Sequence, residues 1–216
     1  MNIAIIGCNG FLGSELKLCS KNFSSAKFFF IDRTSFLPFI KERGSDMNIV
    51  INSAMPSARF WAENNPKDDF IETVQKTRNI IDGFPNAKIV QISSISARTQ
   101  LNKVYGRHKK SAECLLNKDK DLIFRLGPLY GRNLKKGVIL DLINDSTVFI
   151  SGRSKYAFTN ITWVAQKVLD NLHLNGTIEF GAKGYLTIEQ LKSKLNSKSK
   201  FQGKVDHQIF EPFFRL

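Results

Sequence analysis

A tyrosine and a lysine four residues apart, Tyr105 and Lys109, are the residues of this sequence best suited to proton transfer. On a helix that spacing places both side chains on one face, a turn apart. A nearby ammonium favours the phenolate, so such a tyrosine can exchange a proton with a substrate hydroxyl or carbonyl. An isolated pair of this kind usually marks a solvated helix face. Here it follows Ser93 and Ser94, one of which could hydrogen-bond the same substrate oxygen.

The segment GCNGFLG is suited to binding a pyrophosphate. Gly7, Gly10 and Gly13 recur at three-residue intervals directly after an apolar segment. The first glycine allows a tight turn, the second lets the backbone approach a phosphate, and the third lets a helix pack close to the sheet. That helix offers free N–H groups and the positive end of its dipole. The segment therefore predicts binding of a nicotinamide dinucleotide.

Asp32, at the end of the second apolar segment, bears on which dinucleotide binds. A carboxylate there accepts the hydroxyls of the adenosine ribose and repels a 2′-phosphate, which favours NAD. Arg33 leaves NADP open, because a guanidinium can pair with that phosphate. A solvated acid at a strand end is the alternative interpretation of Asp32.

The elements that must position these residues alternate along the chain. Nearly continuous apolar runs are typical of strands buried on both faces of a parallel sheet. Their repetition with amphipathic stretches predicts an α/β fold, a doubly wound parallel sheet (Rossmann fold) with a small C-terminal α/β cap. We expect 1–216 to form a single NAD(P)-binding domain, with cap elements mainly within 132–160 and 176–216. The expected strands are Asn2–Ile6, Lys27–Ile31, Ile49–Asn52, Lys88–Ile92, Leu122–Arg125, Thr147–Ile150 and Thr177–Phe180. The expected helices are Phe11–Ser20, Leu37–Arg43, Lys67–Gly83, Val104–Leu116, Gly137–Asn144, Trp163–Leu172 and Ile188–Leu195.

The composition is that of an ordinary globular protein: of 216 residues, 42% are hydrophobic and 24% are charged. No apolar run approaches the ~18 residues of a membrane span, and the N-terminus lacks the pattern of a secretory signal. Cys8, Cys19 and Cys114 are odd in number and widely spaced. They favour reduced thiols in a cytoplasm.

The net charge of +13 favours an anionic partner. The basic residues are scattered, however, and no nucleic-acid-binding motif accompanies them. A solvated lysine-rich surface is the simpler explanation, so we expect an anionic small molecule and no nucleic acid as partner. His173 and His207 lack cysteine or carboxylate partners at ligand spacing, and His108, between Arg107 and Lys109, is expected to point away from the Tyr105 face, so we expect no metal site.

Taken together, the sequence resembles the extended short-chain dehydrogenases/reductases, of the NAD-dependent epimerase/dehydratase type that acts on nucleotide sugars. The resemblance covers nearly the whole chain. GCNGFLG matches the family's GxxGxxG, and YGRHKKSAE resembles its catalytic helix. RLGPLYG resembles the segment after the fifth strand that borders nicotinamide and substrate. DFIETVQKTRNIID, FTNITWVAQKVL and GTIEFGAKGYLTIEQL resemble further helices and strands of the family.

The resemblance implies a role for each matching residue. Tyr105 would be the acid/base, Lys109 its partner, and Ser94 the donor to the substrate oxygen, with Ser93 as the fallback. The implied cofactor contacts are Gly7, Asn9, Gly10, Phe11, Leu12 and Gly13 at the pyrophosphate, Asp32 and Arg33 at the adenosine ribose, and Ala54, Met55, Pro56, Leu126, Gly127 and Pro128 near the nicotinamide, together with Tyr105 and Lys109. A homodimer through the helices at Lys67–Gly83 and Val104–Leu116 is also implied.

The sequence departs from the family pattern at several points. Thr73 stands where the family has a helix asparagine, and the connection from Ser94 to Tyr105 is short. Arg98 in that connection is a candidate for an anionic substrate group. The substrate region is also trimmed, and Arg132, Lys135, Lys136 and Arg153 within it could receive a diphosphate or simply be solvated.

Two functions follow. The first is an NAD(P)-dependent oxidoreductase or epimerase acting on a nucleotide-activated sugar. A dehydratase is disfavoured, because Ile95 and Ser96 stand where an Asp-Glu pair is typical. The alternative is a catalytically inert NAD(P)-binding sensor or scaffold, which Thr73 and the trimmed substrate region favour.

Overall fold

The structure, a computed structural model, describes residues 1–210 of the chain. Within this range the chain forms two compact units. The first comprises Met1–Arg125 and Thr162–Ile178, and the second comprises Leu126–Ile161 and the chain from Glu179 onward. The glycine-rich turn and the Tyr105–Lys109 pair both belong to the first unit.

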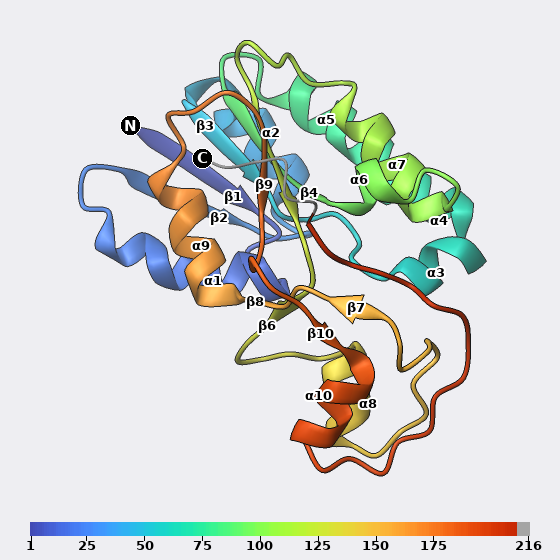
Figure 1. The fold of residues 1–216 in the computed structure, drawn as a ribbon. Helices are drawn as coiled ribbons and strands as arrows, with labels where there is room; N and C mark the ends of the chain where they lie inside the picture. Colours follow the sequence, from blue (N-terminus) through green and yellow to red (C-terminus); the bar gives the residue numbers. More distant parts are fainter. Residues whose placement is uncertain (211–216) are drawn as a thin grey trace. The chain divides into compact units, whose positions relative to one another are not determined.

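The first unit is built on the expected parallel sheet (Figure 1). The strand order is β2-β1-β3-β4-β5-β9, and β1 pairs in parallel with both β2 and β3. The order thus reverses at β1, which is the doubly wound arrangement predicted from the sequence. In such sheets ligands bind outside the carboxyl ends of the strands at the reversal. The strands are β1 (Asn2–Ile6), β2 (Lys27–Ile31), β3 (Ile49–Asn52), β4 (Lys88–Ser94), β5 (Leu122–Leu126) and β9 (Gly176–Phe180).

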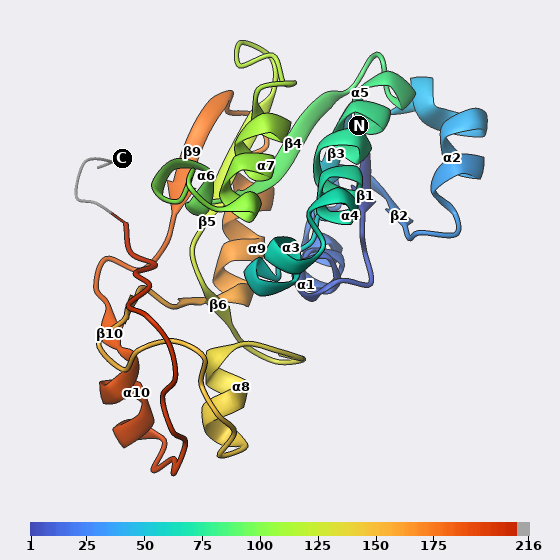
Figure 2. The same cartoon turned by 90° about the vertical axis from the view of Figure 1, so that its right-hand side faces the viewer.

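Helices cover both faces of this sheet. α5 and α7 lie on one side of the sheet, and α1 and α9 lie on the other (Figure 1 and Figure 2). The α-helices of this unit are α1 (Phe11–Cys19), α2 (Phe36–Arg43), α3 (Arg59–Asn64), α4 (Pro66–Phe70), α5 (Lys76–Gly83), α6 (Ser96–Thr99), α7 (Val104–Glu113) and α9 (Ile161–Asp170), with 3-10 turns at Ser20–Asn22 and Gly44–Asp46. Sequence reasoning missed α3 and α6, which are too short for a periodic apolar pattern.

The core explains the apolar strands. Successive side chains of a strand point to opposite faces of the sheet. Ala4 and Ile6 of β1 pack in one cluster with Ile80 and Phe84 from the α5 side. Ile5, between them in sequence, is fully buried on the opposite face. Both faces are therefore covered, and alternation of apolar and polar residues is absent from β1.

The helix expected at Lys67–Gly83 is not uniform. A π-helical turn at Ile71–Gln75 joins α4 to α5 in one continuous helix. Thr73, the residue that departs from the family pattern, lies fully buried in this turn. The Thr77 hydroxyl donates a hydrogen bond of 2.7 Å to the Thr73 carbonyl. The wide turn changes which side chains face α7 and which face the sheet.

The second unit consists of short elements around its own small core. Leu142, Val148, Tyr156 and Ile188 form the buried cluster. The strand expected at Thr147–Ile150 is wrong, because Val148 makes only an isolated bridge to Phe201 and no ladder continues from it. Its elements are β6 (Leu129–Tyr130) paired with β8 (Thr159–Asn160), β7 (Lys155–Tyr156) paired with β10 (Leu186–Thr187), α8 (Val138–Ile143) and α10 (Ile188–Lys194).

Two further observations concern the described residues as a whole. None of the helices between residues 1 and 210 has both the length and the apolar character that crossing a membrane requires. The three cysteines are free thiols, with Cys8 and Cys19 buried and Cys114 exposed. A cytoplasmic location stays a prediction.

Candidate active site

The glycine-rich turn follows β1 at the reversal of the strand order. Gly7 has φ +81°, a conformation that side chains rarely allow, and its N–H donates to the Ile31 carbonyl at 2.8 Å. A Cβ on Gly13 would lie 2.0 Å from the Gly7 carbonyl oxygen. Gly10 precedes α1 in extended conformation, and its N–H donates to the same oxygen at 2.9 Å. The backbone conformation at Gly7 and the close packing at Gly13 therefore allow only glycine at these two positions.

This turn fits a pyrophosphate. α1 begins at Phe11, so the N–H groups of its first turn have no intrahelical partner and are open to an anion. Neither Gly7 nor Gly10 carries a side chain between the turn and the helix end. The sequence-predicted residues Asn9, Phe11 and Leu12 lie in or directly after the turn.

Asp32 is fixed by the residues that follow it. Its Oδ1 accepts hydrogen bonds from the N–H and hydroxyl of Thr34 (3.0 and 2.8 Å) and of Ser35 (3.0 and 2.9 Å). These donors lower the pKa of Asp32 to about 2. Its Oδ2 lies 3.5 Å from the Asn9 amide nitrogen. Asp32 is therefore an ionised, oriented acceptor beside the glycine-rich turn.

Arg33 is oriented differently. Its side chain is 85% exposed, and its guanidinium lies 3.4 Å from Glu72, which also pairs with Lys76. The guanidinium is thus already offset by a carboxylate.

The segment after β3 lies against the glycine-rich turn. Asn52 donates to the Gln91 side chain at 2.9 Å and accepts from the Ala54 N–H at 3.2 Å. A Cβ on Gly7 would lie 2.8 Å from the Ala54 Cα. The Met55 sulfur lies 2.9 Å from the Gln91 amide nitrogen. The segment that starts at Ala54 and continues through Met55 and Pro56 therefore begins directly beside the glycine-rich turn.

Tyr105, Lys109 and Ser94 are brought together as the sequence predicted. Tyr105 and Lys109 on α7 are 7% and 3% exposed, and the Lys109 Nζ lies 5.2 Å from the centre of the Tyr105 ring. Ser94, at the end of β4, hydrogen-bonds Tyr105. Ser93 points elsewhere and donates to Glu113 at 2.7 Å. Of the two serines, Ser94 is thus the one beside the tyrosine.

Burial shifts the proton affinities of this pair toward the neutral forms. Desolvation raises the pKa of Tyr105 to about 12, opposed by the hydrogen bond from Ser94 and the charge of Arg59. Desolvation lowers the pKa of Lys109 to about 7, opposed by the charges of Asp69 and Glu113. Lys109 therefore gains and loses a proton near neutral pH, next to a phenol that holds its proton.

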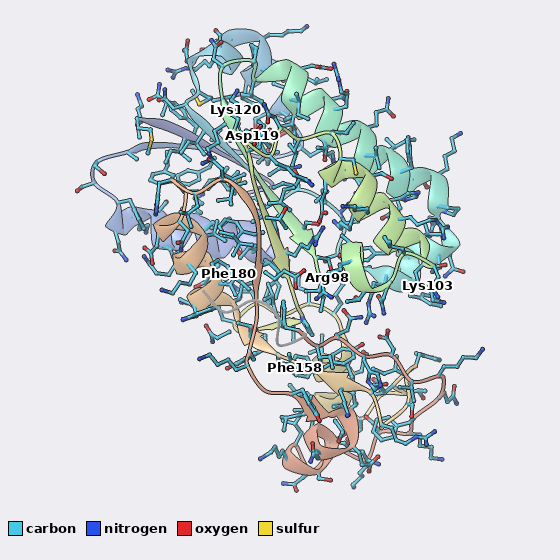
Figure 3. The ribbon with its side chains drawn as sticks, turned by 45° about the horizontal axis from the view of Figure 1, so that its top comes forward. Arg98, Lys103, Asp119, Lys120, Phe158 and Phe180 are labelled. Atoms are coloured by element: carbon cyan, nitrogen blue, oxygen red, sulfur yellow. The ribbon has the colours of Figure 1, made fainter. Side chains whose placement is uncertain are left out.

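Sequence reasoning missed three residues near this pair. Arg59 on α3 and Asp69 on α4 both act electrostatically on Tyr105. His108, adjacent to Lys109, lies 2.7 Å from Asp69 between its Nδ1 and the carboxylate Oδ2. No short-range spacing connects these residues, because α3 and α4 reach α7 only through tertiary packing. Arg98, the candidate for an anionic group, lies half-buried on α6 in the connection from β4 to α7 (Figure 3).

Some predicted residues lie in the second unit. Leu126, Gly127 and Pro128 belong to it, as do the basic residues between 132 and 153. The Pro128 carbonyl accepts a hydrogen bond of 2.9 Å from the Thr159 N–H. A role of Leu126, Gly127 and Pro128 at a nicotinamide stays a prediction.

Comparison with solved structures identifies the fold. No family model matches the chain, and neither does any curated protein. A UDP-glucuronic acid 4-epimerase from Bacillus cereus, solved with UDP-glucuronic acid and NAD, is 19% identical with a TM-score of 0.82, covering 95% of this chain and 87% of that one. A UDP-glucose 4-epimerase from Thermus thermophilus, solved with NAD, is 14% identical with a TM-score of 0.80, covering 98% and 91%.

A third solved structure extends the range of activities. A dTDP-4-dehydrorhamnose reductase from Clostridium acetobutylicum is 21% identical with a TM-score of 0.78, covering 95% of this chain and 84% of that one. At these identities the likeness establishes the Rossmann-type α/β fold. The first two neighbours are epimerases and the third is a reductase, so the fold alone does not choose between these activities.

Proposed function

We propose that this protein is an NAD-dependent oxidoreductase or epimerase acting on a nucleotide-activated sugar. The observation that carries the proposal is the buried set of Tyr105, Lys109 and Ser94 in the same unit as the glycine-rich turn. The structural neighbours solved with NAD and a nucleotide sugar support the cofactor and the substrate class. A protein that only binds the dinucleotide has no physical need for this set.

Each residue of the set has a part in the reaction. NAD bound at the glycine-rich turn supplies a hydride acceptor or donor. Tyr105 exchanges the proton of the reacting hydroxyl at its phenolic oxygen. Ser94 hydrogen-bonds the substrate oxygen and orients it. Lys109, with its pKa near 7, favours the phenolate by its positive charge when it is an ammonium.

NAD rather than NADP fits the surroundings of the ribose site. The ionised Asp32 is held in place by Thr34 and Ser35 and would repel a 2′-phosphate. Arg33, the residue that could attract that phosphate, already faces Glu72. We therefore infer a preference for NAD, which a comparison of NADH and NADPH binding affinities would test.

The second unit is proposed to form the substrate cap. The cap elements expected within 132–160 and 176–216 overlap this unit, Leu126–Ile161 and the chain from Glu179 onward, which supports the proposal. We keep the single functional domain and the homodimer through α4, α5 and α7 as further proposals. Sedimentation of the purified chain would test the dimer.

The experiment that tests the function compares wild type with Tyr105→Phe. The change in NADH absorbance is followed with a panel of nucleotide sugars and their keto forms, and epimerisation is followed by separating the products. We expect turnover on at least one member of the panel and a loss of a hundredfold or more (about 10²–10⁴) in Tyr105→Phe. NADH affinity should be unchanged in the variant.

The alternative function is a catalytically inert NAD(P)-binding sensor or scaffold. Thr73, in place of the asparagine expected from the resemblance, favours it, because its buried hydroxyl oxygen has no hydrogen-bond partner within residues 1–210. Tight NADH binding by wild type with no turnover on any member of the panel would establish this alternative and end the enzymatic proposal.

A further inference from the structure

Asp69 and His108 form a buried carboxylate–imidazole pair next to Lys109. Asp69 on α4 is fully buried, and its Oδ2 lies 2.7 Å from the Nδ1 of His108 on α7. The next residue of α4, Phe70, contacts the imidazole ring edge-on with ring centres 5.5 Å apart. Two consecutive residues of α4 thus hold the histidine, and the histidine side chain keeps 16% of its surface in contact with solvent.

The second carboxylate oxygen of Asp69 is kept open. Asp69 Oδ1 is buried, and no group within residues 1–210 hydrogen-bonds it. A buried carboxylate oxygen without a partner costs stability, so its persistence calls for a reason. The charge of Asp69 acts on both Tyr105 and Lys109. The open oxygen therefore belongs to a carboxylate whose charge acts on both groups.

The other charges near Lys109 are already paired or occupied. Glu113, one helical turn further on α7, is bound by Ser93, by Arg125 from β5 at 2.9 and 2.6 Å, and more weakly by Lys110. Arg59 on α3 acts on Tyr105 and has a hydrogen bond to Gln100 at 3.5 Å. Among the described groups acting on Lys109, Asp69 alone combines a carboxylate with an open oxygen.

We propose that Asp69 and His108 conduct protons between Lys109 and solvent. In one passage the proton between Asp69 Oδ2 and His108 Nδ1 settles on Nδ1, while the outer imidazole nitrogen releases its own proton to water. Asp69 Oδ1 then takes a proton from Lys109 across one water molecule, so that one N–H bond of Lys109 breaks and one O–H bond forms on Asp69. An imidazole suits this role because it can hold a proton at one ring nitrogen while it releases one from the other. The proposal rests on the proposed function, in which the charge of Lys109 favours the Tyr105 phenolate.

The first test measures Lys109 and needs no substrate. The titration of its Nζ is followed by NMR in the full chain labelled with ¹⁵N-lysine, the signal being assigned by its loss in Lys109→Met. Asp69→Asn removes a charge that favours the ammonium, so the midpoint should fall by about one pH unit. Asp68→Asn is the matched control, since this carboxylate is the preceding residue of α4 and exposed. An unchanged midpoint in Asp69→Asn overturns the proposal.

The second test asks whether His108 moves protons or only packs. His108→Asn keeps a donor for Asp69 but cannot relay a proton, whereas His108→Ala removes both functions. We expect both variants to lose about tenfold in turnover at unchanged NADH affinity, and added imidazole to restore His108→Ala. Wild-type turnover in His108→Asn, or no rescue of a folded His108→Ala, overturns the proposal.

The two proposals fail in different ways. If wild type turns over no member of the panel, the proposed enzymatic function is wrong. The Lys109 titration still decides whether Asp69 governs the protonation of this lysine. If wild type is active and the titration and rescue are both negative, the function stands and the Asp69–His108 pathway is wrong.

Discussion

Two buried carboxylates, Asp69 and Glu113, act on Lys109, and their surroundings differ. Glu113 has both oxygens occupied, by the Ser93 hydroxyl and a bidentate Arg125 guanidinium. Asp69 has one oxygen on His108 and one without a partner among residues 1–210. Both carboxylates act on Lys109. The difference shows that equal burial does not imply an equal role: the saturated group holds α7 to β5, whereas the open one is suited to exchange.

The largest expected effect is the difference in protein stability between variants of Glu113 and variants of Asp69. Glu113→Ala removes the buried carboxylate that binds the Arg125 guanidinium and the Ser93 hydroxyl, which costs about 3–5 kcal/mol in the free energy of unfolding. Asp69→Asn keeps a polar contact with His108 and should change that free energy by less than about 1 kcal/mol. Urea denaturation measures both, with the exposed Glu42→Ala as control. Equal losses in Glu113→Ala and Asp69→Asn would remove the distinction.

A second prediction concerns the pH dependence of stability. The pKa of Lys109 falls from its ordinary value to about 7 in the folded protein, so between about pH 7 and 10 the unfolded chain binds the extra proton. Stability should therefore rise with pH in this window, by up to about 1.4 kcal/mol per pH unit from this group. Above about pH 10 the raised pKa of Tyr105 reverses the slope. Lys109→Met should flatten the rise, and an unchanged slope would place Lys109 outside this buried environment.

A smaller effect compares the two carboxylates in turnover. Asp69→Asn should lower turnover by about tenfold (~1.4 kcal/mol), because the open oxygen no longer accepts a proton. Glu113→Gln keeps the hydrogen bond to Ser93 and should leave turnover within about threefold when the protein is folded. Steady-state rates at pH 7, with circular dichroism to verify folding, measure the contrast. A greater loss in Glu113→Gln would make Glu113 the proton-handling group.

The smallest effect extends the comparison to an exposed carboxylate. Asp32, like Asp69, has one oxygen saturated and one more open. Asp32→Asn should weaken NADH binding about fivefold and NADPH binding less, because repulsion of the 2′-phosphate is removed along with a ribose acceptor. Fluorescence titration with both nucleotides measures the ratio. If the affinities for NADH and NADPH changed by the same factor, Asp32 would support the glycine-rich turn and would not bind the adenosine ribose.

The sheet and the paired residues of the site were predictable from local patterns. Buried parallel strands are apolar throughout, so Asn2–Ile6, Lys27–Ile31 and Ile49–Asn52 were predicted with their observed bounds. Tyr105 and Lys109 share one helix, and helical spacing alone predicted their proximity.

What the sequence did not show depends on tertiary packing or on short elements. Asp69 and His108 lie 39 residues apart and meet only because α4 packs on α7. The strands of the second unit have only two residues each, which is too short for a pattern of alternating apolar and polar residues. The apolar residues of Thr147–Ile150 therefore suggested a strand where the structure has none. The π-helical turn leaves no mark in the apolar periodicity of Lys67–Gly83.

The π-helical turn determines how α4 and α5 are rotated relative to each other about the axis of their common helix. Each residue of an α-helix advances the helix by about 100°, so one residue added to a turn re-aims everything beyond it. Asp69 lies before the wide turn and meets α7, while Thr77 lies after it and receives a hydrogen bond from Gln91 of β4 at 3.2 Å. Deleting a single residue from 71–75 would keep the helix and nearly all of its composition. The side chains of Asp69 and Thr77 could then no longer face α7 and β4 at the same time. The number of residues in the π-helical turn thus determines which side chains of this helix reach the site.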